Sequence, residues 1–129
     1  MKKIKRLLFL LSSLLLLGAC APIGSESGYQ SITMDEAASR MKKETDYIIL
    51  DVRTAGEFAA GHIPNAINVA NEEIGTDPIP ALPEKGQLIF VYCRSGRRSK
   101  EAAQKLAAMG YTRIIEFGGI LDWQGEIER

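Results

Sequence analysis

The sequence predicts a single α/β domain, in which helices alternate with the strands of a largely buried sheet. Two observations support this fold class. From Tyr29 onward, strand-like and helix-like segments alternate along the chain. The length of 129 residues fits one domain, and a content of 46% hydrophobic and 25% charged residues is typical of globular proteins. This composition excludes disordered, collagenous, coiled-coil and multi-span membrane proteins.

Two capping boxes mark the helix starts in the first half of the domain. Thr33 can cap a helix, and Glu36 follows it at the spacing that completes the box. Thr54 and Glu57 repeat the pattern and predict a second, short helix, which Gly61 can end. Each helix start therefore has a local physical cause that is visible in the sequence.

The strands are predicted from short apolar runs. Residues 47–50 and 88–92 are almost entirely apolar, as expected for strands covered on both faces of a sheet. Residues 113–117 indicate a last strand, and residues 66–69 are a weaker strand candidate. Residues 75–85, which contain three prolines, predict a loop.

The first 20 residues have the layout of a bacterial export signal. Four basic residues lie within the first six, and residues 7–17 carry no charge. The segment Leu17-Gly18-Ala19-Cys20 resembles a lipobox, which implies cleavage before Cys20 and a lipid on that cysteine. A transmembrane helix is less favoured, because the apolar stretch of about 13 residues is shorter than the ~17–25 needed to span a bilayer. An ordinary secretory cleavage site beside a cysteine is the other alternative.

These features divide the chain into three parts. We predict a signal peptide over residues 1–19, a lipidated Cys20 with a short tether over residues 20–28, and a folded domain over residues 29–129. The lipid would hold the protein in the cell envelope, on the extracytoplasmic side of a bacterial membrane. Without residues 1–19 the chain keeps 16 − 4 = 12 basic and 16 acidic side chains. This negative balance argues against a nucleic-acid partner, which needs a basic face.

Cys93 is the candidate reactive residue. It follows the strand at 88–92 and precedes a helix expected from about 99 to 109, where α/β folds bind ligands. Its loop, residues 94–98, carries three arginines, and backbone N–H groups at a loop-to-helix junction bind anions. This positive field favours the thiolate, so we interpret Cys93 as a nucleophile for an anionic electrophile. The alternative, a small apolar residue at a strand end, is less favoured because like charges cluster at a cost.

Four ordered motifs resemble those of the rhodanese-like sulfurtransferases. Together they cover nearly all of residues 29–127. The resemblance implies a five-stranded, mostly parallel sheet with helices on both faces. The motifs are Asp51-Val52-Arg53 with Glu57-Phe58, Gly61-His62-Ile63-Pro64-Asn65-Ala66-Ile67-Asn68, Cys93-Arg94-Ser95-Gly96-Arg97-Arg98-Ser99, and Gly118-Gly119 with Trp123.

The resemblance also implies a chemistry for the loop. In this family the loop cysteine takes the outer sulfur of a donor such as thiosulfate, becomes a persulfide, and passes that sulfur to a thiol or cyanide. Cys93 would be the catalytic residue, and the expected partners are a small anionic sulfur donor and a thiol, cyanide or protein acceptor. No metal or organic cofactor is implied. The expected substrate-binding residues are Arg94, Ser95, Gly96, Arg97 and Arg98, although one of the three arginines could instead bind a carboxylate of the scaffold.

Other residues of the motifs are interpreted as structural support. Asp51, Arg53 and Glu57 could form a buried ion-pair network, which we favour over a catalytic role. His62 could be a general base, but a hydrogen-bonded turn histidine is favoured because an activated thiolate needs no base. Ser99 completes the support group.

Two rival functions have different sequence signatures. Cysteine-dependent phosphatases place five residues between the cysteine and an arginine, whereas here Ser99 occupies the arginine position. The loop is also one residue shorter, and a shorter cradle fits a sulfur atom better than a phosphate group, so a phosphatase is disfavoured. A non-catalytic module is the second rival, and because such domains usually lack the loop cysteine, its relevant form keeps Cys93 as a persulfide carrier or redox sensor. Turnover with a free donor and acceptor would distinguish an enzyme from that carrier.

Overall fold

The computed structural model of the protein describes residues 28–129. The predicted signal peptide, Cys20 and nearly all of the tether lie outside these residues, so lipidation and export stay predictions. Within residues 28–129, no helix is both long enough and apolar enough to cross a membrane.

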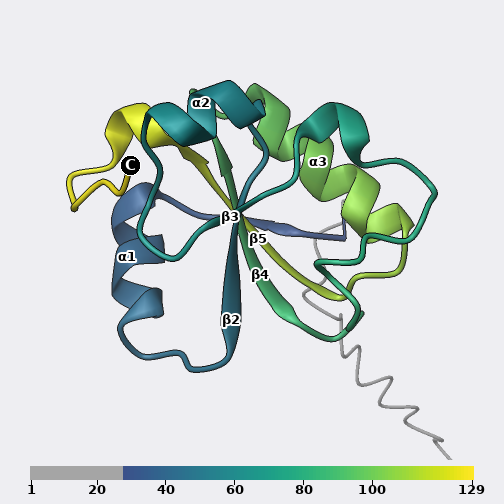
Figure 1. Ribbon diagram of the computed structural model, residues 1–129. Helices are drawn as coiled ribbons and strands as arrows, with labels where there is room; N and C mark the ends of the chain where they lie inside the picture. Colours follow the sequence, from purple (N-terminus) through teal and green to yellow (C-terminus); the bar gives the residue numbers. More distant parts are fainter. Residues whose placement is uncertain (1–27) are drawn as a thin grey trace, which may run out of the picture.

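Five strands form one sheet in the order β1-β5-β4-β2-β3 (Figure 1). Every pairing between these strands is parallel, which confirms the α/β class and sharpens the expected "mostly parallel" to all parallel. The edge strand β1 was not predicted, because both of its residues are exposed and polar and show no hydrophobic pattern. The strands are β1 (Gln30–Ser31), β2 (Tyr47–Asp51), β3 (Ile67–Asn68), β4 (Leu88–Cys93) and β5 (Arg113–Gly119).

The first two helices, α1 (Met34–Met41) and α2 (Ala55–Ala60), begin at the predicted capping boxes. The hydroxyl of Thr33 accepts the N–H of Glu36 at 3.2 Å, and the Glu36 carboxylate accepts the N–H of Thr33 at 3.1 Å. The same reciprocal pair caps α2. These boxes satisfy backbone donors that the first turn of a helix otherwise leaves free.

The third helix, α3 (Arg97–Ala108), begins two residues earlier than the sequence suggested. Gly96 directly precedes it with a φ of +114°, in the left-handed region that glycine adopts at little cost. This turn reverses the chain within the loop, so the helix can begin immediately after it. The amino end of α3 consequently lies directly beside Cys93.

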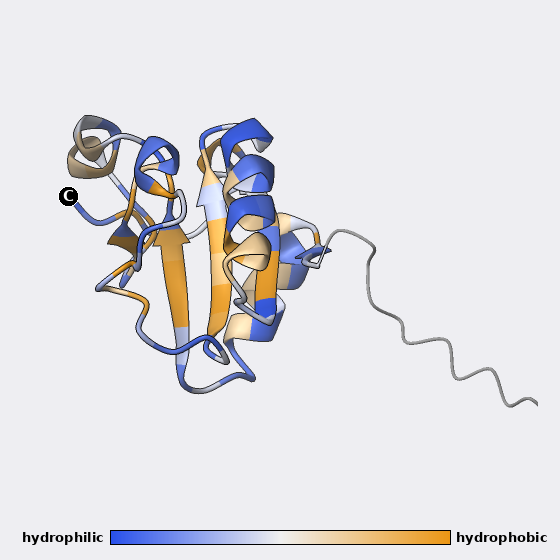
Figure 2. Ribbon diagram, turned by 90° about the vertical axis from the view of Figure 1, so that its right-hand side faces the viewer, coloured by the Kyte–Doolittle hydropathy of each residue, from blue (hydrophilic) through white to orange (hydrophobic). Residues whose placement is uncertain are grey.

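Helices cover both faces of the sheet, and each face has its own core cluster. Figure 2 shows the apolar strands between helices whose outer faces are hydrophilic. One cluster joins the sheet to α3, and the other joins it to α1 and the segment after α2. All six residues of β4 are buried. Two short 3₁₀ helices, η1 (Asn71–Glu73) and η2 (Ile120–Asp122), complete the elements, and residues 75–85 form the predicted loop.

Candidate active site

Cys93 is the last residue of the central strand β4, at the carboxyl edge of the sheet. Side chains alternate along a strand, so Cys93 shares the α3 face with Ile89 and Val91. Its side chain is almost completely covered, with 1% of the residue exposed. The fold therefore presents the sulfur at the amino end of α3, where ligands bind in open parallel sheets.

The loop after Cys93 curls back over the sulfur. The N–H of Gly96 donates to Sγ of Cys93 at 2.9 Å, a contact that favours a negative charge on sulfur. This N–H points at the sulfur because Gly96 adopts the left-handed turn described above. The geometry therefore provides one backbone donor of the anion cradle that the sequence predicts.

Gly119 explains why the loop lies so close to β5. A Cβ atom at this position would lie 2.0 Å from the carbonyl oxygen of Arg94 and 2.4 Å from the nitrogen of Ser95. Only glycine leaves room for the loop backbone here. The N–H of Leu121 also donates to the Arg94 carbonyl at 3.3 Å. The closing motif at Gly118-Gly119 thus packs directly against the backbone of the cysteine loop.

Ser99 was predicted as structural support, and the structure places it in contact with the sulfur. Its Oγ lies 3.4 Å from Sγ of Cys93. It also lies 2.9 Å from the carbonyl oxygen of Gly96 and 2.7 Å from Oε1 of Glu116. Ser99 therefore links the cysteine, the loop and β5.

Glu116 is a site residue that the sequence analysis missed. It is a charged residue of β5, yet only 2% of it is exposed. Its carboxylate accepts hydrogen bonds from the hydroxyls of Ser31 and Ser99 and from the N–H of Gly118. The available signal was a lone carboxylate in the apolar run 114–117, where every other position suits a buried strand.

The three loop arginines have different partners. Arg98 forms a bidentate ion pair with Glu57, with N–O distances of 2.7 and 2.9 Å. The Arg98 guanidinium, together with the hydrogen bonds from Thr54, lowers the pKa of the Glu57 carboxyl to about 2. The Arg98 side chain is thus held by the scaffold, as the sequence analysis allowed for one of the three. Substrate binding by Arg98 stays a prediction.

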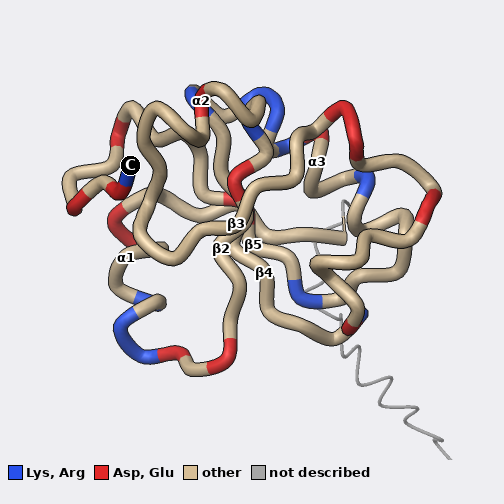
Figure 3. Tube along the Cα trace, viewed as in Figure 1, with Lys and Arg blue, Asp and Glu red and all other residues tan. Residues whose placement is uncertain are grey.

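The other two arginines point outward. Arg97 pairs with Glu101 at 2.8 Å on the exposed side of α3. Arg94 is exposed and takes part in no ion pair or side-chain hydrogen bond among residues 28–129. Figure 3 shows basic residues near the amino end of α3 and beside α2. Arg94 is therefore the loop arginine best placed to attract an anion from solvent.

Asp51 and Arg53 form the buried ion pair that was expected, but Glu57 does not join them. The Asp51–Arg53 distance is 2.6 Å, and Arg53 also donates to the carbonyl of Gly61 at 2.7 Å. The expected three-residue network is wrong in this respect. Glu57, at the start of α2, faces Arg98 at the amino end of α3 instead. The two ion pairs are therefore separate, one at the carboxyl end of β2 and one between the first residues of α2 and α3.

His62 is held by contacts that do not include the sulfur. Its ring stacks on Phe58 with centroids 3.8 Å apart, and Nδ1 lies 3.0 Å from the Phe58 carbonyl oxygen. Nε2 lies 3.4 Å from the carboxylate of Glu128. These partners fit the supporting role proposed for His62 and leave it no contact with Cys93.

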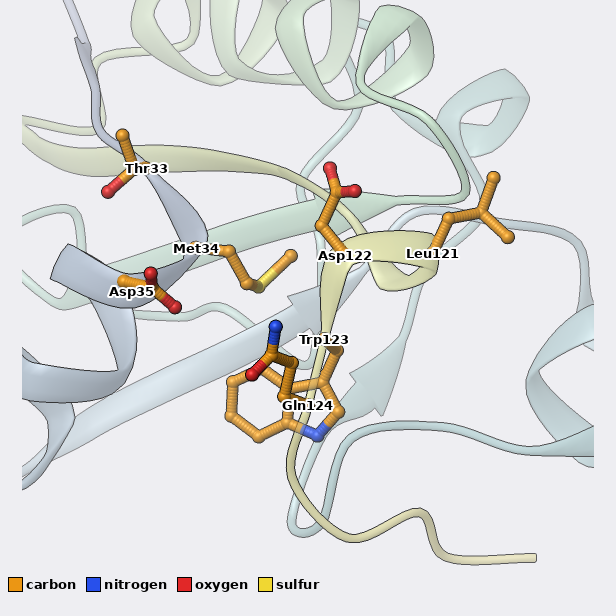
Figure 4. A pocket seen from close by; sticks show the side chains of 7 residues that line it. All are labelled: Thr33, Met34, Asp35, Leu121, Asp122, Trp123 and Gln124. Carbon is orange, nitrogen blue, oxygen red and sulfur yellow. The ribbon is translucent and has the colours of Figure 1, made fainter.

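A pocket of about 400 Å³ lies between the start of α1 and the segment from η2 onward (Figure 4). Met34 and Trp123 line it, and Trp123 packs against the core cluster of that face. Leu121, at its rim, is 63% exposed. None of the loop residues from Cys93 to Ser99 lines this pocket, so it is distinct from the cysteine site.

Within residues 28–129 no three potential metal ligands cluster together.

A five-stranded parallel sheet, with a cysteine at its carboxyl edge whose sulfur accepts a loop N–H, defines a class of protein. The chain belongs to the rhodanese-like domain family, whose pattern matches residues 33–126. It is a single rhodanese-like domain of the sulfurtransferase family, as the motifs suggested.

Known relatives agree with this assignment. Thiosulfate sulfurtransferase PspE of Escherichia coli (strain K12) is 36% identical over 73 residues, which cover 57% of this chain and 70% of that protein. A sulfurtransferase of Allochromatium vinosum is 34% identical over 95 residues, covering 71% of this chain and 85% of that protein. The solution structure of the rhodanese-like domain of an Anabaena protein has a TM-score of 0.68 and 27% identity, and covers 76% of this chain and 77% of that domain.

Proposed function

We propose that the protein transfers sulfane sulfur from a small anionic donor such as thiosulfate to a thiol, cyanide or protein acceptor, through a persulfide on Cys93. The Cys93 thiolate attacks the outer sulfur of thiosulfate. The S–S bond of the donor breaks, and sulfite leaves with its electron pair. The acceptor then attacks the outer sulfur of the persulfide, and Cys93 leaves as a thiolate.

The observation that carries this proposal is the contact between the Gly96 N–H and the Cys93 sulfur at 2.9 Å. A preorganised donor stabilises negative charge on the attacking and leaving sulfur alike. The exposed Arg94 guanidinium lies in the same loop and is free of ion pairs among the described residues. It can attract a dianionic donor and stabilise departing sulfite, and the name of the PspE relative points to thiosulfate as the donor to test first.

The test uses the full chain, purified in detergent, reduced and incubated with thiosulfate. Intact mass is recorded, and thiocyanate is measured after cyanide is added. We expect a mass gain of one sulfur atom on Cys93 and catalytic thiocyanate production. Cys93→Ser is the matched control, since it removes the nucleophile and little volume, and it should fold and show neither signal.

The other outcomes separate the rival functions. A gain of sulfur without turnover would favour a persulfide carrier that needs a protein acceptor. Neither signal from a folded protein would favour a redox-sensing or binding module. Full activity of Cys93→Ser would refute the assignment of the nucleophile.

We further propose that a lipid on Cys20 anchors the domain at the extracytoplasmic face of a bacterial membrane. The support is the lipobox-like segment Leu17-Gly18-Ala19-Cys20 after a short apolar stretch. Expression in a bacterium should give a membrane-bound product with the mass of a chain that begins at an acylated Cys20. Cys20→Ser should be neither acylated nor cleaved at this position, and a wild-type chain without added lipid mass would refute the proposal.

A further inference from the structure

A chain of hydrogen-bonded side chains leads from the reactive sulfur into the protein. Sγ of Cys93 lies 3.4 Å from Oγ of Ser99, and that oxygen lies 2.7 Å from Oε1 of Glu116. All three residues are buried. The reactive thiol therefore contacts no bulk water on this side, and its hydrogen-bond partner is a hydroxyl backed by a carboxylate.

The single hydroxyl hydrogen of Ser99 determines the direction of these hydrogen bonds. Oγ of Ser99 faces three acceptors, namely Oε1 of Glu116 and the carbonyl oxygens of Gly96 and Gly118, but carries a single hydrogen. The shortest and charge-assisted contact is the one to Glu116. Ser99 therefore donates to Glu116, and its lone pair is left to accept the hydrogen of the Cys93 thiol.

Among the described residues, no cation is paired with Glu116, although Lys100 lines the same pocket. The ion pairs among residues 28–129 do not include this residue. Three hydrogen bonds, from Ser31, Ser99 and Gly118, stabilise the carboxylate instead. A second negative charge on Cys93, one hydroxyl away, would be costly in this buried setting. The pair Cys93 and Glu116 is therefore built to hold one negative charge between them.

We propose that Glu116 accepts the proton of the Cys93 thiol through the hydroxyl of Ser99. The S–H proton passes to Oγ of Ser99 while the hydroxyl proton passes to Oε1 of Glu116. The products are a Cys93 thiolate and a neutral Glu116 carboxyl group. Glu116 now donates to Ser99, and Ser99 donates to the thiolate. The thiolate also still accepts the hydrogen bond from the Gly96 N–H. The direction of the hydrogen bonds has reversed. The negative charge has moved from Glu116 to Cys93, and the total charge of the two residues is unchanged.

Other charged groups lie around this chain. Lys100 and Glu36 line a shallow pocket of about 290 Å³ together with Glu116 and Ser31. On the loop side, the Arg98 guanidinium interacts electrostatically with Cys93 and is paired with Glu57. None of these groups forms an ion pair with Glu116, so Glu116 remains the acceptor of the thiol proton.

The inference shares with the proposed function the premise that Cys93 reacts as a thiolate, and it can be tested without any sulfur donor. The full chain is treated with iodoacetamide from about pH 5 to pH 8, and alkylation of Cys93 is followed by peptide mass spectrometry. Because the relay moves the proton within the pair and exchanges none with solvent, the logarithm of the wild-type alkylation rate should change little with pH. In Glu116→Gln the lone thiol should gain about tenfold in rate per pH unit while it is mostly protonated.

Two Ser99 variants and a surface control complete the design. Ser99→Ala interrupts the relay but keeps Glu116, and should show the same steep pH dependence. Ser99→Thr retains the hydroxyl and should restore the flat profile. Glu84→Gln, at an exposed carboxylate in the 75–85 loop, should behave as the wild type.

A flat profile in Glu116→Gln would overturn the relay and leave Glu116 with a structural role only. If that variant does not fold, a flat profile in Ser99→Ala overturns the relay equally. Failure of the proposed function would appear elsewhere, as a wild-type protein that alkylates at Cys93 but gains no sulfur from thiosulfate.

Discussion

Replacing Gly119 by alanine tests whether the cysteine loop is positioned by its contact with β5. The added Cβ would lie 2.0 Å from the Arg94 carbonyl oxygen, whereas ordinary contact begins at 3.4 Å. The two segments must therefore separate by about 3.4 − 2.0 = 1.4 Å. The atoms involved belong to the backbone, so no side-chain rotation relieves the clash.

This separation has consequences for both stability and activity. Overpacking costs ~1–3 kcal/mol, and a backbone clash belongs at the upper end of that range. Because the Gly96 N–H lies 2.9 Å from the Cys93 sulfur, a loop displaced by ~1 Å loses its alignment, and misplacement of that size lowers catalytic rates by about 100-fold. We expect Gly119→Ala to lose about 3 kcal/mol of unfolding free energy and to form the persulfide about 100-fold more slowly.

Urea denaturation followed by circular dichroism measures the first quantity, and the rate of mass gain with thiosulfate measures the second. Gly86→Ala is the matched control, since a Cβ there would meet nothing within 4 Å. It should be neutral or slightly stabilising. A Gly119→Ala protein within 0.5 kcal/mol of the wild type and of equal activity would refute the argument that this contact sets the loop.

Three further predictions follow from the charged residues. Glu57 has its pKa lowered from 4.5 to about 2 in the folded state, so its stabilisation is complete above about pH 4.5 and is lost as the pH falls through 2. Its side chain is 30% exposed, so acidification should cost the wild type only about 1 kcal/mol more than Glu57→Gln. Arg53→Ala should lose ~3–5 kcal/mol of unfolding free energy, because it leaves Asp51 charged, buried and unpaired. Arg94→Ala should raise the KM for thiosulfate about fivefold at low salt, and Arg97→Ala less, because Glu101 already neutralises Arg97.

Each of these has a clear contrary result. If acid shifts the denaturation curves of the wild type and Glu57→Gln equally, the Arg98–Glu57 pair does not contribute to the stability of the fold. A mild effect of Arg53→Ala would mean that Asp51 finds another partner. A larger KM effect at Arg97 than at Arg94 would reverse the roles assigned to the two side chains.

The parts of the fold that were predicted correctly are those with a local cause. Thr33 and Thr54 cap their helices through partners three residues away, so the signal lies within one turn. The strand β4 is apolar at nearly every position because both faces are covered. The edge strand β1 has neither property, and its pairing with β5 joins residues 85 positions apart.

The parts of the site that were missed depend on tertiary contacts. Glu57 and Arg98 are 41 positions apart, and nothing in either segment favours this pairing over one with Arg53. Glu116 reaches Ser99 across 17 positions of sequence, where α3 packs against β5. A carboxylate inside an apolar run indicates that some partner exists, but the identity of the partner requires the fold.

The cysteine loop divides its residues between two tasks. Gly96, Arg98 and Ser99 face the scaffold or the sulfur, whereas Arg94, Ser95 and Arg97 are exposed. The outward positions can therefore change without disturbing the packing that holds the nucleophile. Under the proposed function, donor preference would be open to evolution or redesign at these three surface positions, while the buried contacts that hold the sulfur stay constant.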